Sequence, residues 1–457
     1  MASPDAGVAS PQEARGADIR AETIELLRLS GPVVLSRLGI MAMGLCDAVV
    51  VGRYSAKELG YHALGWAPTS VALTVSLGLL VGVQVMTARA VGEGRRHEVG
   101  AVLRRGLSYS LWVGLAAAAI LMLGGPLLMH SLGLDADLAN GSSRVLIVFA
   151  LSLPMIAISV AASSWLEALS KPGVVTVTMW IANAVNLALL LLLVPGTWGL
   201  PAMGALGGGW ATFGARAALA LMTVAYIWRM PEARALGVFD KPPRDRAAEA
   251  EQRRIGYGAG ASNFFEVAAF ASMNVIAGWI GVLAVASWAV VLNVAAVIFM
   301  VPLGISTATT VLVGRAYGAR DLPGVRRAGA IGFAVAGVFG VLISLIVWPT
   351  ATLIAGGYTT DPAAIALAVP ALVLSCLFFA PDALQVVTAQ ALRARGDVWV
   401  PTTTHMISYT LIMTPLAWWF AIPLGHGLVG IVWAVIIASL VAMAFLGGRW
   451  LMLARRL

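Results

Sequence analysis

Twelve apolar stretches follow one another along this chain of 457 residues, each long enough to cross a membrane as a helix. A bilayer core is about 30 Å thick, and about 20 helical residues span it. Because no water reaches that region, a spanning segment must satisfy its own backbone hydrogen bonds, as a helix does. The pattern predicts an all-α integral membrane protein with twelve transmembrane helices.

Composition agrees with a membrane location. Only 11% of the residues are charged and 60% are hydrophobic, whereas soluble domains are about 25% charged. The net charge of +8 reflects basic residues in the short connections, and no nucleic-acid-binding motif accompanies them. Nucleic acid is therefore excluded as a partner, and membrane lipid is expected to surround the chain.

No motif of enzyme chemistry occurs. The chain lacks HExxH, GxSxG, CxxC and the phosphate loop GxxxxGK[ST], so we expect neither an enzyme nor a nucleotide-driven pump. Cys46 and Cys376 lie in apolar runs and are expected to be small buried hydrophobes. We predict a secondary transporter without a cofactor, driven by an ion gradient.

Basic residues mark alternate connections. They gather at both ends of the chain and in the connections after the second, sixth, eighth and tenth stretches, while the other connections are nearly bare. Basic loops stay in the cytoplasm. Both termini are therefore predicted to be cytoplasmic, with the protein in a bacterial-type inner (plasma) membrane.

One long polar linker divides the twelve predicted spans into two groups of six. The first twenty residues have no apolar core, so we expect no signal peptide there. We expect residues 1–29 to form a cytoplasmic tail, with a surface helix near 22–28. We expect an N-lobe over 30–229, a polar cytoplasmic linker over 230–254 and a C-lobe over 255–457.

The two halves repeat each other. A shift of 226 residues places Gly78 on Gly304 and Arg89 on Arg315. Six spans in each half give both halves the same direction through the membrane, which predicts two pseudo-symmetric lobes that rock about a site between them. A monomer is sufficient for this motion.

Four acidic residues lie inside apolar stretches. An ionisable side chain within the membrane is costly and is a functional candidate by default. Asp47, Glu266 and Asp382 are the main candidates, and Pro381 is expected to loosen the helix beside Asp382. The alternative is that each carboxylate is protonated or satisfied by neighbours, which we favour for Glu167. Two basic residues, Arg37 and Arg216, also lie inside apolar stretches. We favour a structural role for both of them.

The acidic residues do not follow the repeat, because the shift places Met273 opposite Asp47 and Ile40 opposite Glu266. The two lobes are therefore expected to have different functions although they share a fold. Aromatic side chains near the acids favour lipophilic cations through cation–π attraction, although any one of them could serve packing alone. The candidate lining residues are Phe264, Phe265, Trp288, Asn293, Phe299, Phe378, Phe379 and Tyr409, with Asn183 and Asn186 in the N-lobe.

Several motifs resemble the MATE (multidrug and toxic compound extrusion) exporters, within their NorM-like branch. They are MGLCDAVVVGR with Asp47, NFFEV with Glu266, LNVAAVIFMVPLGISTATTVLVGRAYGA, and PDALQVVTAQALRARGD with Asp382. Each motif is weak alone, but their order and doubling are specific, and the resemblance extends from about Gly31 to Arg449.

The resemblance implies a V-shaped pair of six-helix lobes and the export of organic cations, drugs or metabolites in exchange for Na⁺ or H⁺. It places the coupling ion on Glu266 and Asp382, which would bind Na⁺ directly in a sodium-coupled protein. It gives Asp47 a role in protonation or substrate binding. Family members often carry an Asn pair in the fifth helix, and Asn183 and Asn186 match that pattern only in part.

Two other functions stay open. A flippase for lipids or lipid-linked oligosaccharides in the same superfamily would be expected to have a basic cavity, whereas the buried charges of the key helices are mainly acidic. A receptor or scaffold with this fold would have no use for three buried carboxylates.

Overall fold

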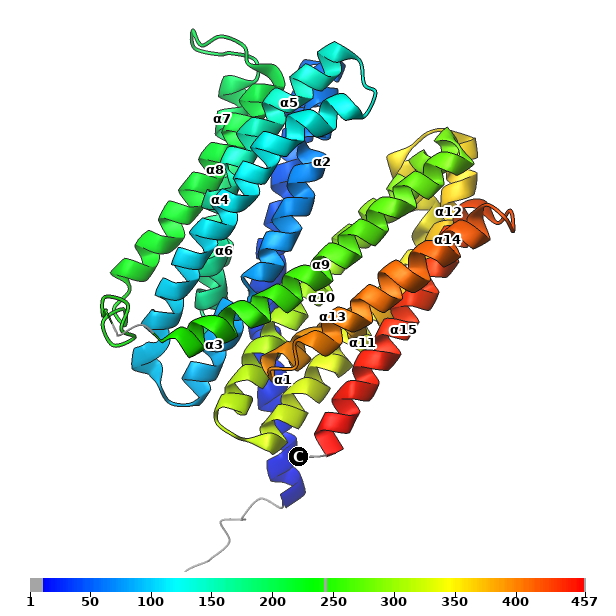
Figure 1. Ribbon diagram of the computed structural model, residues 1–457. Helices are drawn as coiled ribbons and strands as arrows, with labels where there is room; N and C mark the ends of the chain where they lie inside the picture. Colours follow the sequence, from blue (N-terminus) through cyan, green and yellow to red (C-terminus); the bar gives the residue numbers. More distant parts are fainter. Residues whose placement is uncertain (1–10, 242–244, 456–457) are drawn as a thin grey trace, which may run out of the picture.

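The chain forms two helical bundles, the N-lobe and the C-lobe, that diverge toward one end (Figure 1). The computed structural model describes residues 11–241 and 245–455. Within these ranges eleven helices are long and apolar enough to cross a membrane. One further crossing is built from three pieces: α13 (Trp399–His405), the π-helical segment η2 (Met406–Met413) and α14 (Thr414–Ala421). The prediction of an all-α, two-lobed membrane protein is confirmed.

The N-lobe contains the helices of the first half of the chain. They are α1 (Pro11–Tyr54), α2 (Ala56–Leu79), α3 (Val81–Gly92), the 3-10 turn η1 (Arg96–Glu98), α4 (Val99–Ser131), α5 (Ala136–Leu151), α6 (Leu153–Ala168), α7 (Pro172–Leu193) and α8 (Gly204–Arg229). The pairs α2–α3 and α5–α6 each make a single crossing.

The C-lobe contains the second half. Besides α13, η2 and α14, its helices are α9 (Arg246–Ile280), α10 (Val282–Gly318), α11 (Leu322–Tyr358), α12 (Pro362–Ala394) and α15 (Gly427–Arg455). Aspartates cap several of them, because a carboxylate can accept from the unpaired N–H groups of a first turn. Asp245 accepts from Ala247 and Ala248 at the start of α9, both at 3.0 Å.

Both ends of the described chain lie where the lobes converge, at the end with the charged connections (Figure 1). We call this the basic end; it carries residues 93–98, 230–241, 319–321 and 395–398. The lobes meet through α1, α2 and α3 on one side and α9 and α10 on the other. A Cβ atom on Gly78 would lie 2.7 Å from the Cα atom of Gly260, so α2 and α9 cross in backbone contact, as small residues permit in membranes.

Two predicted boundaries differ from the structure. The first part of the 230–254 linker packs on the N-lobe through buried Met230, Ala233 and Leu236, and α9 already begins at Arg246. The predicted tail is helical from Pro11, and Leu26 and Leu29 are buried against the C-lobe. In both places scattered apolar residues pack on the lobes although the local sequence is polar. Residues 1–10, 242–244 and 456–457 lie outside the described part of the chain.

The loosening expected at Pro381 does not interrupt α12, which runs unbroken from Pro362 to Ala394. The irregular segment is η2, in the next crossing. Pro415 follows it and has no N–H to donate to the preceding turn, while the N–H of Thr414 bonds to the carbonyl of Tyr409, five residues back. Such π segments often occur at functional sites.

Candidate functional site

Three elements of the C-lobe bring Glu266 and Asp382 into one polar cluster. Glu266 lies on α9 and Asp382 on α12, close enough for their charges to interact. Gln385, one turn beyond Asp382, donates from Nε2 to Asp382 Oδ1 (3.3 Å) and to the hydroxyl of Tyr409 on η2 (3.0 Å). The two carboxylates that the sequence singled out are therefore brought together, with Tyr409 beside them.

A buried arginine completes this cluster. Arg393 is 2% exposed and lies within electrostatic reach of Glu266. As one of the basic residues after the tenth apolar stretch it was predicted to lie in a cytoplasmic connection, but it belongs to the last turn of α12. Its spacing was the available signal, since Asp382, Gln385 and Arg393 stand at i, i+3 and i+11 and so share one helix face.

His405 is a second residue that the sequence analysis missed. It is 2% exposed, and its Nδ1 atom lies 3.1 Å from Ser262 Oγ. Its ring packs edge-on against that of Tyr409, with the ring centroids 5.5 Å apart. Its position in α13, one turn before Tyr409, gives the only sequence hint. It links α9 to the irregular crossing beside the acidic pair.

The cluster retains unused hydrogen-bonding atoms. Gln385 Oε1, Ser408 Oγ, His405 Nε2 and two guanidinium nitrogens of Arg393 are buried without a partner among the described residues. Buried polar atoms are normally paired. The unpaired amide oxygen of Gln385, next to Asp382, is the kind of donor that hard cations prefer.

Asp47 lies apart from this cluster, in a small cavity of the N-lobe. It is 2% exposed, and its Oδ2 atom accepts from Thr212 Oγ1 (2.6 Å), while Oδ1 has no partner among the described residues. Arg216 lines the same cavity, donates to Ser152 Oγ (2.6 Å) and stacks over Trp66. The cavity thus pairs one acid with one base on largely apolar walls.

The two asparagines of α7 have different surroundings. Asn186 is fully buried beside Asp47, and its amide has no hydrogen-bond partner in the described chain. Asn183 donates to the carbonyls of Gly39 and Met179, both at 3.0 Å. Asn186 therefore belongs to the neighbourhood of Asp47, and Asn183 ties α7 to α1.

Glu167 has structural partners. It is buried in α6, where Arg37 approaches to 3.7 Å and Gln84 donates to it at 3.2 Å. These contacts connect three helices near the basic end, and the structural role favoured from sequence stays a prediction.

The predicted aromatic residues fall into two groups. Trp288, Phe378, Phe379 and Tyr409 are buried in the C-lobe core, with Phe378 and Phe379 packed edge-on. The others are at least partly exposed: Phe264, Phe265 and Phe299, with Asn293, whose amide bonds within its own helix. Tyr409 is the member of the set that contacts the acidic cluster.

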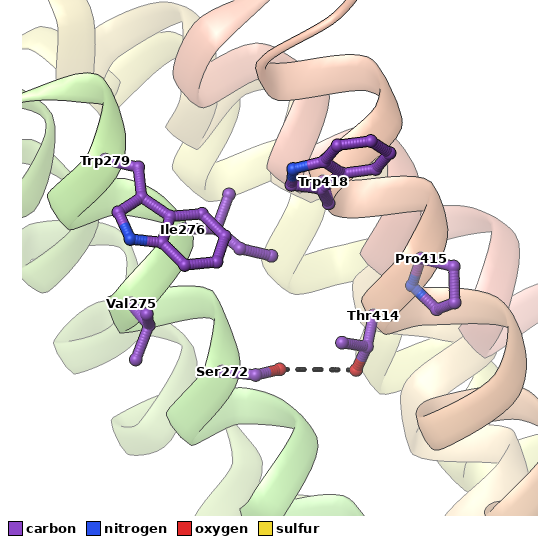
Figure 2. A pocket seen from close by; sticks show the side chains of 7 residues that line it. All are labelled: Ser272, Val275, Ile276, Trp279, Thr414, Pro415 and Trp418. Carbon is purple, nitrogen blue, oxygen red and sulfur yellow. Dashed lines mark hydrogen bonds between the residues drawn. The ribbon is translucent and has the colours of Figure 1, made fainter.

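An apolar groove runs between α9 and α14, shown in Figure 2. Trp279 and Trp418 flank it, Val275, Ile276 and Pro415 add apolar wall, and Ser272 and Thr414 form its polar floor with hydroxyls 3.2 Å apart. Ser272 follows Glu266 by six residues, a rise of about 9 Å along α9. The groove therefore lies about 9 Å further along α9 than Glu266, toward the end where the lobes diverge.

Both lobes of the chain match one family of known proteins. The MatE family model matches residues 32–192 and 259–419, one match in each lobe. The chain is 64% identical over 443 residues to the probable multidrug resistance protein NorM of Caulobacter vibrioides, covering 97% of this chain and 94% of that protein. It is 30% identical to the multidrug resistance protein PmpM of Pseudomonas aeruginosa, covering 91% of this chain and 85% of the relative.

Solved structures agree in fold. A crystal structure of MATE in the bent conformation matches with a TM-score of 0.85 at 18% identity, covering 96% of this chain and 98% of the other. An outward-facing MATE family transporter matches with a TM-score of 0.86 at 19% identity, covering 95% and 97%. This chain therefore belongs to the MATE family of multidrug efflux transporters, in its NorM-like branch, and is a membrane transporter rather than an enzyme.

Proposed function

We propose that this transporter exports organic cations in exchange for an inward flow of Na⁺ or H⁺. The observation that carries the proposal is the pairing of Glu266 with Asp382 beside Arg393 in the C-lobe. Two carboxylates and one guanidinium leave one negative charge uncompensated. A single monovalent cation or one proton would neutralise the cluster, which is the property required of a coupling site.

Asp47 is proposed as the N-lobe group that binds the substrate or is protonated. With Asp47 ionised, its charge balances that of Arg216 in the same cavity, and its unpaired Oδ1 can accept from an ammonium group. Protonation would remove that acceptor and leave Arg216 unopposed, which repels a cation. Loading and release would then follow the protonation of one residue.

The groove between α9 and α14 supports the lipophilic part of the proposal. Trp279 and Trp418 are 64% and 44% exposed, and indole rings attract cations and apolar groups alike. A cation with an apolar body could rest there while its charge faces the acidic cluster.

Orientation follows from the connections. Basic loops favour the cytoplasm, which would place the basic end and both termini inside and make the lobes diverge toward the outside. The proposed transport cycle then alternates between this form and one that is open at the basic end, with a monomer as the working unit.

The test is efflux of a fluorescent lipophilic cation from proteoliposomes, with a Na⁺ gradient and a pH gradient imposed separately. We expect one gradient to drive export and Asp382→Asn to abolish it. If neither gradient moves any cationic dye, the antiport proposal is wrong, and movement of lipid-linked substrates would then favour a flippase.

A further inference from the structure

Arg89 reaches from the N-lobe to the C-lobe at the basic end. It lies near the end of α3, and its Nε atom donates to the carbonyl of Ala394 (2.9 Å), while Nη2 donates to the carbonyl of Arg393 (3.3 Å). Its Nη1 atom lies 3.5 Å from Glu251 of α9. One N-lobe side chain thus holds the last turn of α12 and the first part of α9.

Arg315 makes the reverse contact, from the C-lobe to the N-lobe. It lies near the end of α10, and Nη2 donates to the carbonyl of Ala168 (2.6 Å) and to Ser170 Oγ (2.8 Å). Its Nη1 atom lies 3.4 Å from Glu25 of α1. This side chain therefore holds the last turn of α6 and the first part of α1.

The contacts of Arg89 and those of Arg315 are related by the internal repeat. The 226-residue shift that relates Arg89 to Arg315 also relates Ala168 to Ala394 and Glu25 to Glu251. Each arginine therefore shares two contacts with its counterpart, with the lobes exchanged: the carbonyl of a last helical residue and a glutamate. The third contact differs, because Arg89 donates to the carbonyl of Arg393 and Arg315 donates to Ser170 Oγ. The acidic residues of the proposed transport sites do not obey this shift, whereas the helix-end carbonyl and the glutamate that each arginine contacts do.

The chemistry of these contacts is strong but short in range. The last carbonyls of a helix have no partner within it and carry the negative end of the helix dipole, and a guanidinium presents several donors in a fixed fork. The backbones beneath are close: a Cβ on Gly92 would lie 2.0 Å from the carbonyl oxygen of Arg315, and one on Gly318 would lie 2.3 Å from that of Arg89. A separation of a few ångströms would therefore break both sets of bonds.

We propose that Arg89 and Arg315 form a paired latch that keeps the basic end of the lobes closed and must open on both sides when the transporter alternates. The proposal rests on the alternating-access cycle proposed above. Because the two halves of the latch are equivalent, each contributes to closure, and loss of either favours the form that is open at the basic end.

The experiment measures the separation of the lobes directly. Spin labels are attached at Ala235→Cys on the N-lobe and Arg326→Cys on the C-lobe, both exposed at the basic end, in a full-length chain with Cys46→Ala and Cys376→Ala. Pulsed electron–electron double resonance in lipid nanodiscs measures the distribution of distances between the two spin labels. Arg89→Ala or Arg315→Ala is expected to raise the ratio of open to closed molecules about tenfold, and the double variant about a hundredfold, as loss of charged hydrogen bonds would give.

Arg449→Ala is the matched control. Arg449 also forms a charged hydrogen bond at the basic end, to Asp397 (2.6 Å), but both residues belong to the C-lobe, so the distance distribution should not change. If an alanine variant does not purify as a monodisperse protein, the pair Arg89→Lys and Arg315→Lys tests the same contacts, because lysine keeps the charge and loses the fork.

The latch is refuted if the double variant has the distance distribution of the parent protein, or if Arg449→Ala shifts it equally. Failure of the latch and failure of ion-driven antiport give different results. A shift in distance without ion-driven export would refute antiport and leave the latch in place, while ion-driven export with an unshifted double variant would do the opposite.

Discussion

The side-chain amide of Gln385 lies 3.0 Å from the hydroxyl of Tyr409 and donates to it, while the same nitrogen lies 3.3 Å from Asp382. The two hydrogen bonds of this amide nitrogen join α12 to the π-helical segment η2. Tyr409 is fully buried, so the hydroxyl has little access to water as a substitute partner. The position of the Asp382 carboxylate thus depends on a neighbouring crossing.

Tyr409→Phe is expected to weaken binding of the coupling ion and to leave the fold intact. The substitution removes one hydrogen bond, worth about 0.5–1.5 kcal/mol, which corresponds to an increase of roughly 2- to 12-fold in the ion concentration that gives half-maximal export. Dye efflux at graded ion concentrations measures it. Tyr358→Phe, at an exposed tyrosine of the same lobe, is the control, and equal values for the two variants would contradict the assignment of Tyr409.

Arg393→Ala is expected to raise the affinity for the coupling ion and to slow turnover. Removal of the guanidinium leaves Glu266 and Asp382 without a balancing charge, so the cluster should hold its cation more tightly and release it more slowly. We expect the half-saturating ion concentration and the maximal rate both to fall several-fold. The unfolding temperature of the variant, measured alongside export, shows whether the change in ion affinity comes with a loss of stability.

Arg395→Ala is the control for that change. Arg395 lies two residues further on and stacks over Trp450, away from the acidic pair. A maximal rate that falls while the half-saturating concentration stays constant in Arg393→Ala would indicate a purely structural arginine.

The limits of sequence reasoning are clear at Arg393. Apolar periodicity and loop charges predicted the spans, the repeat and the acids, because membrane burial constrains every residue of a spanning helix. They could not show that α12 continues to Ala394, which draws Arg393 into the protein. Where a helix ends near the interface depends on neighbouring helices, and so does the burial of a charge in its last turn.

The effects of Pro381 and Pro415 on their helices could not be predicted from the sequence either. Pro381 predicted a disturbed helix, but α12 is unbroken there, and the disturbed segment η2 lies instead just before Pro415. A missing N–H leaves one carbonyl without its donor, and whether the helix widens depends on what else can bond to that carbonyl. Packing at the start of α1, where Leu26 is buried, was likewise hidden by a polar local sequence.

Glu266→Gln and Asp382→Asn are expected to insert and fold yet lose ion-driven export, whereas Glu167→Gln keeps most of it. The first two remove the charges that attract the coupling ion, and the third weakens the contacts of Glu167 with Arg37 and Gln84. Efflux from proteoliposomes, normalised to the amount of inserted protein, gives the comparison. Wild-type rates in both C-lobe variants would remove the coupling site from this cluster.

Pro415→Ala tests whether the π segment serves transport. Alanine restores the missing N–H, so residues 406–421 should tend toward a regular α-helix, which turns by 100° per residue and would rotate Tyr409 away from Gln385. We expect an unchanged or raised unfolding temperature, since alanine favours helix over proline by about 3 kcal/mol, together with at least a tenfold loss of ion-driven export.

Pro370→Ala is the matched control, because Pro370 lies inside α12, which is α-helical throughout. Its export should stay close to that of the parent protein. Wild-type export by Pro415→Ala would mean that the acidic cluster works equally well on a regular helix, and the irregular segment would then have to be explained by packing of α14 alone. A loss of export with a gain in stability would instead show that the chain gives up helix stability at Met406–Met413 to hold Tyr409 beside Asp382.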